Sequence, residues 1–216
     1  MDSKRSIARI AEVILEAKVQ IVCLQEVHRF LPQSMLINQA KWLAKHLGMK
    51  YVFQKNFSIG LAGLGNAILS SFDIISHCSH SLTSRGETRG LLEVQLQTPK
   101  GKLTVYCTHL GLDAQERLVQ VGEIAAVINA ANGAKVLCGD MNEVISASAV
   151  SKLLASTDFA DTLPNGFPTY PSDSPTHRID FVFCNPLVRV VSTQTLETNA
   201  SDHLPVIVEM DIAAVQ

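Results

Sequence analysis

The chain is poor in charged and aromatic residues. Charged residues make up 18% of its 216 residues and aromatic residues 6%, and its formal net charge is −2. Such a chain has no general electrostatic attraction for nucleic acid or an anionic membrane, which leaves only a local patch for such binding. No apolar run is long enough to cross a bilayer, and no basic stretch followed by an apolar run opens the chain. We therefore expect neither a membrane span nor a secretory signal.

The cysteines do not form a recognisable framework. There are five, an odd number, and their spacing is not that of a zinc site: Cys23, Cys78, Cys107, Cys138 and Cys184. Most of them lie inside apolar, strand-like runs, which is typical of small core side chains in a reducing compartment. The sequence therefore predicts a cytoplasmic protein. Its length and its 47% hydrophobic content predict one well-buried domain over residues 1–216.

Amphipathic helical patterns alternate with short apolar runs, which predicts an α/β fold. The helical patterns cover residues 3–18, 35–47, 115–131 and, more briefly, 147–154. The strand-like runs cover residues 19–24, 51–53, 66–70, 73–79, 91–97, 103–109, 136–138, 178–183, 187–195 and 206–210. Residues 59–65 are rich in glycine, but their spacing is not that of a dinucleotide-binding loop, so we predict a flexible loop that enters a strand.

The run 136–138 ends abruptly in Gly139, Asp140, Met141 and Asn142. Because side chains alternate along an extended backbone, Asp140 and Asn142 should point one way and Met141 the other. A carboxylate and a carboxamide side by side can hold a water molecule or a hard cation. Asp and Asn also favour simple turns after strands, so the four residues alone leave both interpretations open.

Other apolar strands end in the same way. Glu26, His109, Asp180 and the pair Asp202 and His203 all lie in or at the ends of strand-like runs. If those ends converge, several carboxylates and two imidazoles meet near the core, where unpaired carboxylates repel each other and take up protons. A divalent cation would resolve that conflict. Oxygen ligands favour a hard ion, so we expect Mg²⁺, with Mn²⁺ as the alternative.

Seven motifs in order resemble those of the endonuclease/exonuclease/phosphatase superfamily, whose members include DNase I-like nucleases, inositol polyphosphate phosphatases and neutral sphingomyelinases. The motifs are Gln25-Glu26, Gly65-Asn66, Arg89-Gly90, Thr108-His109-Leu110, Gly139-Asp140-Met141-Asn142, Arg178-Ile179-Asp180-Phe181 and Ser201-Asp202-His203. The resemblance implies a four-layer α/β/β/α sandwich of two mixed sheets. It also implies Mg²⁺-dependent hydrolysis of phosphate esters through in-line attack of water.

The resemblance also implies roles for individual residues. Glu26 would be the principal metal ligand, and Asp202 would reach the metal or its waters. The remaining catalytic roles would fall to Asp140 and Asn142 at the attacking water, to His109 and His203 at the phosphate oxygens, and to Asp180 as the partner that orients His203. Substrate contacts would come from Asn66, Arg89 and Arg178, with arginine offering a planar fork suited to phosphate.

The beginning of the chain departs from the family pattern. Members of this superfamily normally begin with a strand whose asparagine joins the metal-site network, whereas here Met1 directly precedes the first helical pattern. Either the start is misplaced or trimmed, or the strand is absent. Its loss would leave a sheet short of a strand, and the orphan position could recruit a strand from a second chain.

The sequence limits the substrate less well than the reaction. Low net charge and few aromatics favour a small or lipid-derived phosphodiester or phosphomonoester over nucleic acid, with a DNA or RNA nuclease as the alternative. Residues 167–171 are similar to the substrate-rim segment of small bacterial members described as metal-dependent hydrolases. An alternative of another class is a catalytically silent domain that binds a phosphorylated ligand. The oligomeric state cannot be predicted.

Overall fold

Helices and strands alternate along the chain as the apolar patterns predict, over the residues 3–164 and 166–212 that this computed structural model describes. The helices are α1 (Ser3–Ala17), η1 (Pro32–Ser34), α2 (Gln39–Leu47), α3 (Ala114–Ala130) and α4 (Ser148–Ser156). The strands are β1 (Ile21–Arg29), β2 (Lys50–Ile59), β3 (Ala62–Ser70), β4 (Asp73–Leu82), β5 (Arg89–Thr98), β6 (Gly101–His109), β7 (Ala134–Asp140), β8 (Ala160–Asp161), β9 (Asp180–Cys184), β10 (Val188–Thr195) and β11 (Val206–Ile212). None of these helices is long and apolar enough to cross a membrane.

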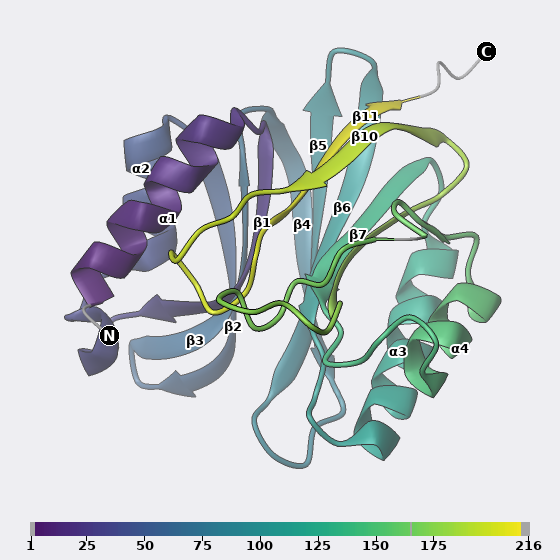
Figure 1. The fold of residues 1–216 in the computed structure, drawn as a ribbon, viewed down its shortest axis with the longest axis horizontal. Coiled ribbons are helices and arrows are strands. Elements are labelled where there is room, and N and C mark those ends of the chain that lie inside the picture. Colours follow the sequence, from purple (N-terminus) through teal and green to yellow (C-terminus); the bar gives the residue numbers. More distant parts are fainter. Residues whose placement is uncertain (1–2, 165, 213–216) are drawn as a thin grey trace.

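One sheet forms the centre of the molecule. Its six strands follow the order β4-β5-β6-β7-β9-β8, and it is mixed, because β6 and β7 are parallel while the other neighbours are antiparallel. The connection from β6 to the parallel strand β7 passes through α3, which covers the outer face of this sheet together with α4 (Figure 1). The strands predicted for residues 91–97 and 103–109 are confirmed, and they pair as the antiparallel hairpin β5 and β6.

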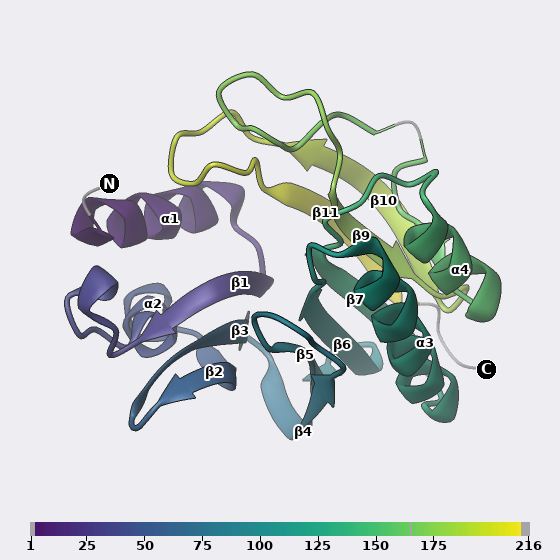
Figure 2. The ribbon, with the colours of Figure 1, turned by 90° about the horizontal axis from the view of Figure 1, so that it is seen from below.

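The second sheet layer is divided. A three-stranded antiparallel sheet, β1-β3-β2, and a two-stranded antiparallel sheet, β10-β11, lie over the same face of the central sheet (Figure 2). Helices α1 and α2 cover the outer face of the three-stranded part. The α/β sandwich implied by the family resemblance is therefore confirmed. Within the described residues only the central sheet is mixed, because the two parts of the other layer are built from antiparallel pairs.

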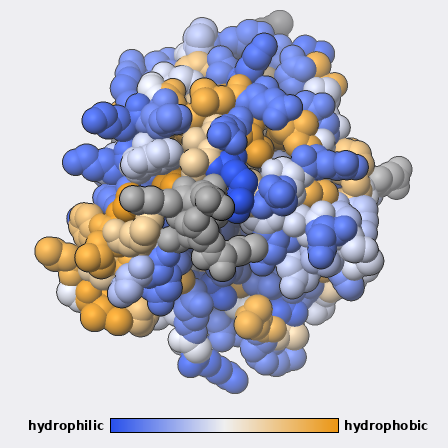
Figure 3. Space-filling view, turned by 60° about the vertical axis from the view of Figure 1, so that its left-hand side comes forward, coloured by the Kyte–Doolittle hydropathy of each residue, from blue (hydrophilic) through white to orange (hydrophobic). Residues whose placement is uncertain are grey.

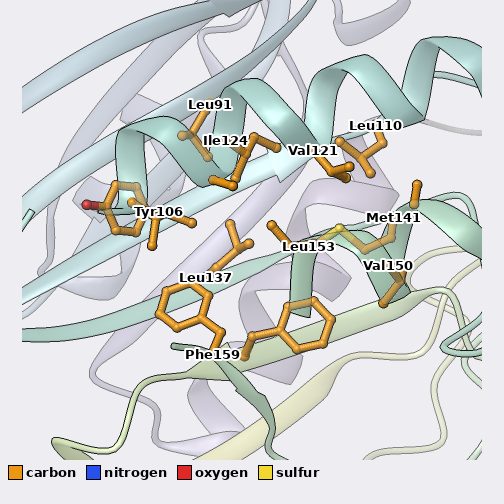
Figure 4. Close-up of a cluster of buried hydrophobic side chains, with 14 of the residues drawn as sticks. Leu91, Tyr106, Leu110, Val121, Ile124, Leu137, Met141, Val150, Leu153 and Phe159 are labelled. Atoms are coloured by element: carbon orange, nitrogen blue, oxygen red, sulfur yellow. The ribbon is translucent and has the colours of Figure 1, made fainter. Parts of the chain in front are cut away.

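Three apolar clusters hold the four layers together. One lies between the central sheet and helices α3 and α4 (Figure 4), a second between the two sheet layers, and a third between β1, β3 and helices α1 and α2. The inner strands β5, β6, β7 and β9 of the central sheet are mostly buried because both faces of the sheet are covered there, whereas the edge strand β4 is mostly exposed. This burial explains the nearly continuous apolar runs of β6, β7 and β9 in the sequence.

Helix α2 begins later than predicted. The apolar pattern placed its start at residue 35, but Met35 and Leu36 have φ angles of 52° and 59° and are exposed. The helix instead begins after Asn38, whose side-chain oxygen accepts a hydrogen bond from the backbone N–H of Lys41. An N-cap asparagine satisfies a backbone donor that the first helical turn leaves free, which fixes the start more strongly than apolar spacing does.

The glycine-rich segment 59–65 is not a flexible loop. It forms the tight turn between β2 and β3, with Gly60 at a φ of +57°, and Gly63 and Gly65 lie inside β3. A Cβ atom on Gly65 would collide with the backbone carbonyl of Gln54 on β2, so glycine here permits close strand pairing. Leu61 at the tip of this hairpin is exposed. Figure 3 shows that apolar residues cover part of one side of the molecule.

We expect Leu137→Ala to lower the free energy of unfolding by about 2–5 kcal/mol. Leu137 lies on β7, is fully buried and belongs to the cluster beneath α3 and α4 (Figure 4). Its truncation therefore leaves a cavity that the surrounding strands cannot close. Urea denaturation followed by circular dichroism measures the change. The matched control is Val191→Ala on the exposed strand β10, for which we expect a change within about 0.5 kcal/mol. Equal losses in both variants would contradict this assignment of the core.

Candidate functional site

The centre of the site is a row of side chains on three neighbouring strands. His109 and Asp140 are the last residues of the parallel strands β6 and β7 and lie opposite each other in the register. Asp180 is the first residue of the antiparallel strand β9 and lies opposite Asp140. Parallel strands end at the same edge of a sheet, and an antiparallel neighbour begins there, so the register brings the three side chains together.

His203 completes the row from the segment that precedes β11. Its Nδ1 lies 2.9 Å from Oδ2 of Asp180. The hydroxyl of Thr169 donates to the same carboxylate oxygen at 2.5 Å, and the Thr169 carbonyl accepts the backbone N–H of Leu204. The ring of Tyr170 lies against the His203 ring, with centroids 4.7 Å apart. The 169–170 segment therefore fixes both the position and the orientation of His203.

The four residues after Cys138 are both a turn and part of the site. The backbone N–H of Asn142 donates to Oδ1 of Asp140 at 2.7 Å, and Asn142 has a φ of +48°. Its side-chain Nδ2 donates to the carbonyl of Leu110 and lies 3.0 Å from Nε2 of His109. Met141 points the other way and is fully buried in the core, as the alternation predicted. The turn therefore places Asn142 beside His109.

Groups that offer only N–H donors lie beside both ring nitrogens of His109. The Arg89 guanidinium lies 3.1 Å from Nδ1, and the Asn142 amide nitrogen lies 3.0 Å from Nε2. The nearest carboxylate oxygen to Nε2 is Oδ2 of Asp140, at 3.4 Å. Burial lowers the pKa of His109 to about 3, with smaller contributions from the charges of Arg89 and His203. His109 is therefore neutral at physiological pH.

The pKa values of Asp140 and His203 are raised, in contrast to that of His109. Burial and the neighbouring charge of Asp180 raise the pKa of Asp140 to about 6, although the hydrogen bond from Asn142 lowers it. Burial alone would lower the pKa of His203, but the hydrogen bond and charge of Asp180, together with the other nearby carboxylates, raise it to about 9. At neutral pH the row thus holds one ionised carboxylate base, one neutral imidazole and one imidazolium.

The chemistry of these donors fits a divalent cation. Ligand atoms of Asp140, Asp180 and His203 lie within 4.8 Å of one another. The crowding of the two carboxylates, visible in the raised pKa of Asp140, is a repulsion that a cation would relieve. Carboxylate oxygens are ligands for both Mg²⁺ and Mn²⁺, so the two aspartates suit either ion, whereas His203 as an imidazolium has no lone pair with which to bind a cation.

The two residues predicted as metal ligands lie at the margin of this group. Glu26 sits in a bulge of β1 with a φ of +53°, and its Oε1 lies 3.9 Å from Nδ1 of His109. Its side chain is 64% exposed, so its carboxylate is accessible from solvent. Asp202 is also exposed, and its charge contributes to the raised pKa of His203. Both carboxylates therefore border the row without belonging to its closest group.

Asn66 and Arg89 lie behind the row. Asn66 is 1% exposed and donates its amide to the carbonyls of Gly90 and Cys107, so in this structure it joins β3 to β5 and β6. Arg89 is 7% exposed and contacts Glu87 and His109, but its buried Nε has no partner among the described residues. A buried guanidinium N–H without an acceptor is costly unless a ligand satisfies it, which is consistent with a phosphate contact at Arg89.

Arg178 is not brought to the row by the contacts it makes. Its guanidinium binds the carboxylate of Asp161 through two hydrogen bonds of 2.7 and 2.6 Å, donates to the carbonyl of Leu163 and lies over the ring of Phe181. The Arg178 and Asp161 side chains are 10% and 7% exposed. This bidentate pair holds the loop between β8 and β9, called the rim loop because it contains the rim segment 167–171, to β8.

We expect Arg178→Met to lower the free energy of unfolding by about 3–5 kcal/mol, because it leaves the Asp161 carboxylate buried and unpaired. A substrate-binding role would instead raise KM without loss of stability. Urea denaturation and steady-state kinetics on the same variant separate the two. Arg189→Met is the control, since Arg189 is 71% exposed and its ion pair should contribute less than about 1 kcal/mol.

Sequence reasoning did not assign roles to Thr169 and Tyr170. Both lie in the segment that resembled a substrate rim, but a threonine in a loop rich in proline and serine carries no signal of its own. Thr169 is fully buried, and its hydroxyl donates to the Asp180 carboxylate from a position 11 residues earlier in the chain. Only the folded arrangement of the rim reveals that contact.

Comparisons with known proteins agree with this arrangement. A sequence model described as the endonuclease/exonuclease/phosphatase family matches residues 1–203. No curated protein matches the sequence significantly. Among solved structures, an endonuclease/exonuclease/phosphatase from Beutenbergia cavernae is similar at a TM-score of 0.82 and 23% identity, over 96% of this chain and 66% of that one. The present chain thus spans about two thirds of that protein.

The names of two further similar structures state an activity or a bound anion. The mannosyl-6-phosphatase of Bacteroides thetaiotaomicron matches with a TM-score of 0.77 and 19% identity, over 97% of this chain and 92% of that one. The catalytic domain of human Nocturnin, which holds a sulfate anion, also matches with a TM-score of 0.77 and 19% identity, over 97% and 87% of the two chains. At such low identity these likenesses establish the shared fold.

Proposed function

The chain belongs to the endonuclease/exonuclease/phosphatase family, and from this membership and the geometry of the site we propose that it hydrolyses phosphate esters with the help of a divalent cation. The observation that carries the proposal is the row of His109, Asp140, Asp180 and His203 at one edge of the sandwich. Members of the family act on phosphate esters, and the row supplies a base and two hydrogen-bond donors of the kind that such a reaction needs.

In this proposal the attacking water is bound by Asp140. A carboxyl group with a pKa of about 6 is largely ionised at neutral pH and still basic enough to accept a proton as the water attacks phosphorus. Asn142, fixed by its hydrogen bonds to Asp140 and Leu110, helps to orient that water or the phosphate. As the new P–O bond forms, the ester P–O bond on the opposite side of phosphorus breaks, and the released alkoxide takes a proton from solvent water to become the alcohol.

The two histidines stabilise the charge that develops on the phosphate oxygens. His203 is held in its charged form by Asp180 and can donate from Nε2. His109 is a neutral imidazole, and in this proposal its Nε2, 3.4 Å from Oδ2 of Asp140, carries the ring proton and donates to the phosphate. Donors that are already oriented stabilise a transition state more than donors that must reorganise.

We assign the cation to the carboxylates that border the row, Glu26 first, with Asp202 reaching the ion or its waters. Magnesium or manganese, when bound, neutralises charge and polarises the phosphorus. For the substrate we propose a small or lipid-derived phosphodiester or phosphomonoester, because the net charge of −2 offers no general attraction for a nucleic acid. No residue of the row distinguishes between the two ester classes.

The test is a substrate screen on the purified protein with bis(p-nitrophenyl) phosphate, p-nitrophenyl phosphate and supercoiled plasmid DNA. We expect turnover of a small ester with Mg²⁺ or Mn²⁺, its loss with excess EDTA and its return when the cation is restored. Cleavage of the plasmid in preference to small esters would establish a nuclease instead. Absence of turnover, together with no cation binding by calorimetry, would favour a silent domain that binds a phosphorylated ligand.

A further inference from the structure

Two short loops carry the residues that follow the ends of β6 and β7. Residues 110–112 follow His109, and residues 141–143 follow Asp140. The loops contact each other twice: the backbone N–H of Leu110 donates to the carbonyl of Asp140 at 3.0 Å, and the side chain of Asn142 donates to the carbonyl of Leu110 at 2.9 Å. The position of Asn142 beside His109 therefore depends on how the two loops lie relative to each other.

Helix α3 binds the first of these loops through its backbone groups. The backbone N–H of Gly111 donates to Oε1 of Gln120 at 2.9 Å. Nη1 of Arg117 donates to the carbonyls of Gly111 and Leu112 at 3.1 and 2.7 Å. A Cβ atom on Gly111 would lie only 2.4 Å from Oε1 of Glu116, so the loop lies directly against the helix. The loop after β6 is thus fixed to the first turns of α3.

Glu143 fixes the second loop to two helices. Its Oε2 accepts from Nε of Arg117 at 2.7 Å. Its Oε1 accepts the backbone N–H groups of Ala149 and Val150 at 2.5 and 3.3 Å. These groups belong to the first turn of α4, whose N-cap residue Ala147 makes no side-chain capping bond. The side chains of Arg117 and Glu143 are 11% and 4% exposed, so one buried ion pair joins both loops to α3 and α4.

A buried ion pair of this kind is not required for stability alone. Moving two charges out of water costs free energy that their attraction recovers only in part, and an apolar pair of similar volume often stabilises a fold equally well. An apolar pair cannot, however, fix the direction of two backbone segments, because apolar packing is not directional. The guanidinium of Arg117 donates in fixed directions, so it can hold two loops in one relative position.

We propose that Arg117 and Glu143 are positioning residues, which together hold Asn142 against His109 and so determine where the phosphate and the attacking water lie. This inference rests on the proposed hydrolysis of phosphate esters. Both residues act through the loops, because their contacts are with loop carbonyls and with the first turn of α4. A misplacement of about 1 Å in the groups that orient the reactants can reduce the rate about 100-fold.

Glu143→Gln separates the ion pair from the capping of α4. Its Oε1 can still accept the backbone N–H of Ala149, but its amide nitrogen then faces Nε of Arg117, so that one donor meets another. We expect kcat for the ester that the screen identifies to fall by about 10–100-fold, without a comparable change in KM. Arg117→Met should have the same effect. The double variant should be no slower than either single variant, because the two residues act as one unit.

Lys135→Met is the matched control. Lys135 is another buried cation between α3 and β7, but it lies at the opposite end of β7 from Asp140 and binds the carbonyls of Ile128 and Ala131 at the end of α3. Its replacement removes a buried charge from the same helix and strand without touching either loop. We therefore expect kcat to be unchanged.

Amide hydrogen exchange provides a measurement that does not depend on turnover. The backbone N–H groups of Leu110, Gly111 and Asn142 are all hydrogen-bonded within the two loops or to α3. Glu143→Gln should speed their exchange by at least about tenfold while the amides within β6 and β7 keep their rates. Lys135→Met should leave the exchange of these three amides unchanged.

The two measurements separate this inference from the proposed function. If the unmodified protein hydrolyses an ester, an unchanged kcat in both Glu143→Gln and Arg117→Met overturns the inference. If it hydrolyses none, the proposed function fails and hydrogen exchange decides: unchanged exchange at Leu110 and Asn142, or equal acceleration throughout β6 and β7, overturns the inference. Should Arg117→Met fail to fold, Glu143→Gln decides alone, because it keeps the side-chain volume and the cap of α4.

Discussion

We expect Asp140→Asn to reduce kcat by about 10³-fold and to leave the fold intact. Asparagine has nearly the volume of aspartate, and its Oδ1 can still accept the backbone N–H of Asn142, so the turn after β7 survives. It cannot accept a proton from water, however. The loss should therefore appear in kcat at every concentration of Mg²⁺, without a comparable change in KM.

The measurement is steady-state hydrolysis of the ester that the screen identifies, with circular dichroism and urea denaturation as evidence of folding. Asp73→Asn is the matched control, because Asp73 is an exposed carboxylate at the start of β4, far from the row in sequence and in the sheet. It should retain full activity. Turnover close to that of the unmodified protein in the Asp140 variant would refute the role of Asp140 as base.

His203→Ala should lower kcat by about 10²–10³-fold, the usual effect of removing one oriented donor from a developing oxyanion. The carboxylate of Asp180 keeps its hydrogen bond from Thr169 in this variant, so the rim should remain in place. Added imidazole, which can enter the space left by the ring, should restore part of the rate.

His77→Ala provides the control, since His77 is an exposed histidine on β4. Its replacement should leave kcat unchanged. A His203 variant that kept its rate, or that unfolded as readily as a core variant, would show that the ring serves the structure and not the reaction. Rescue by imidazole distinguishes these cases, because a purely structural defect does not respond to a free imidazole that can replace the missing donor.

The sequence predicted the elements of the site better than their contacts. Polar residues at the ends of apolar runs were visible as a pattern, and β6, β7 and β9 do carry His109, Asp140 and Asp180 at one edge. Alternation along an extended chain is a local property, so the burial of Met141 opposite its neighbours followed from the sequence as well.

Contacts between distant segments could not be predicted. The pairing of Arg178 with Asp161 and the hydrogen bond from Thr169 to Asp180 depend on how the rim loop returns to the sheet. The start of α2 at Asn38 shows the same limit at short range, because a capping side chain prevailed over an apolar pattern. The division of the outer sheet layer appeared in the sequence only through the family resemblance.

Because three members of the row lie on neighbouring strands, the pairing of those strands determines the spacing of their side chains. The spacing of His109, Asp140 and Asp180 is set by backbone hydrogen bonds, which hold opposed Cα atoms roughly 5 Å apart. A slip of one residue between two of these strands would turn the side chain of His109, Asp140 or Asp180 toward the opposite face and expose core residues. Errors in the site are therefore coupled to a large loss of folding free energy.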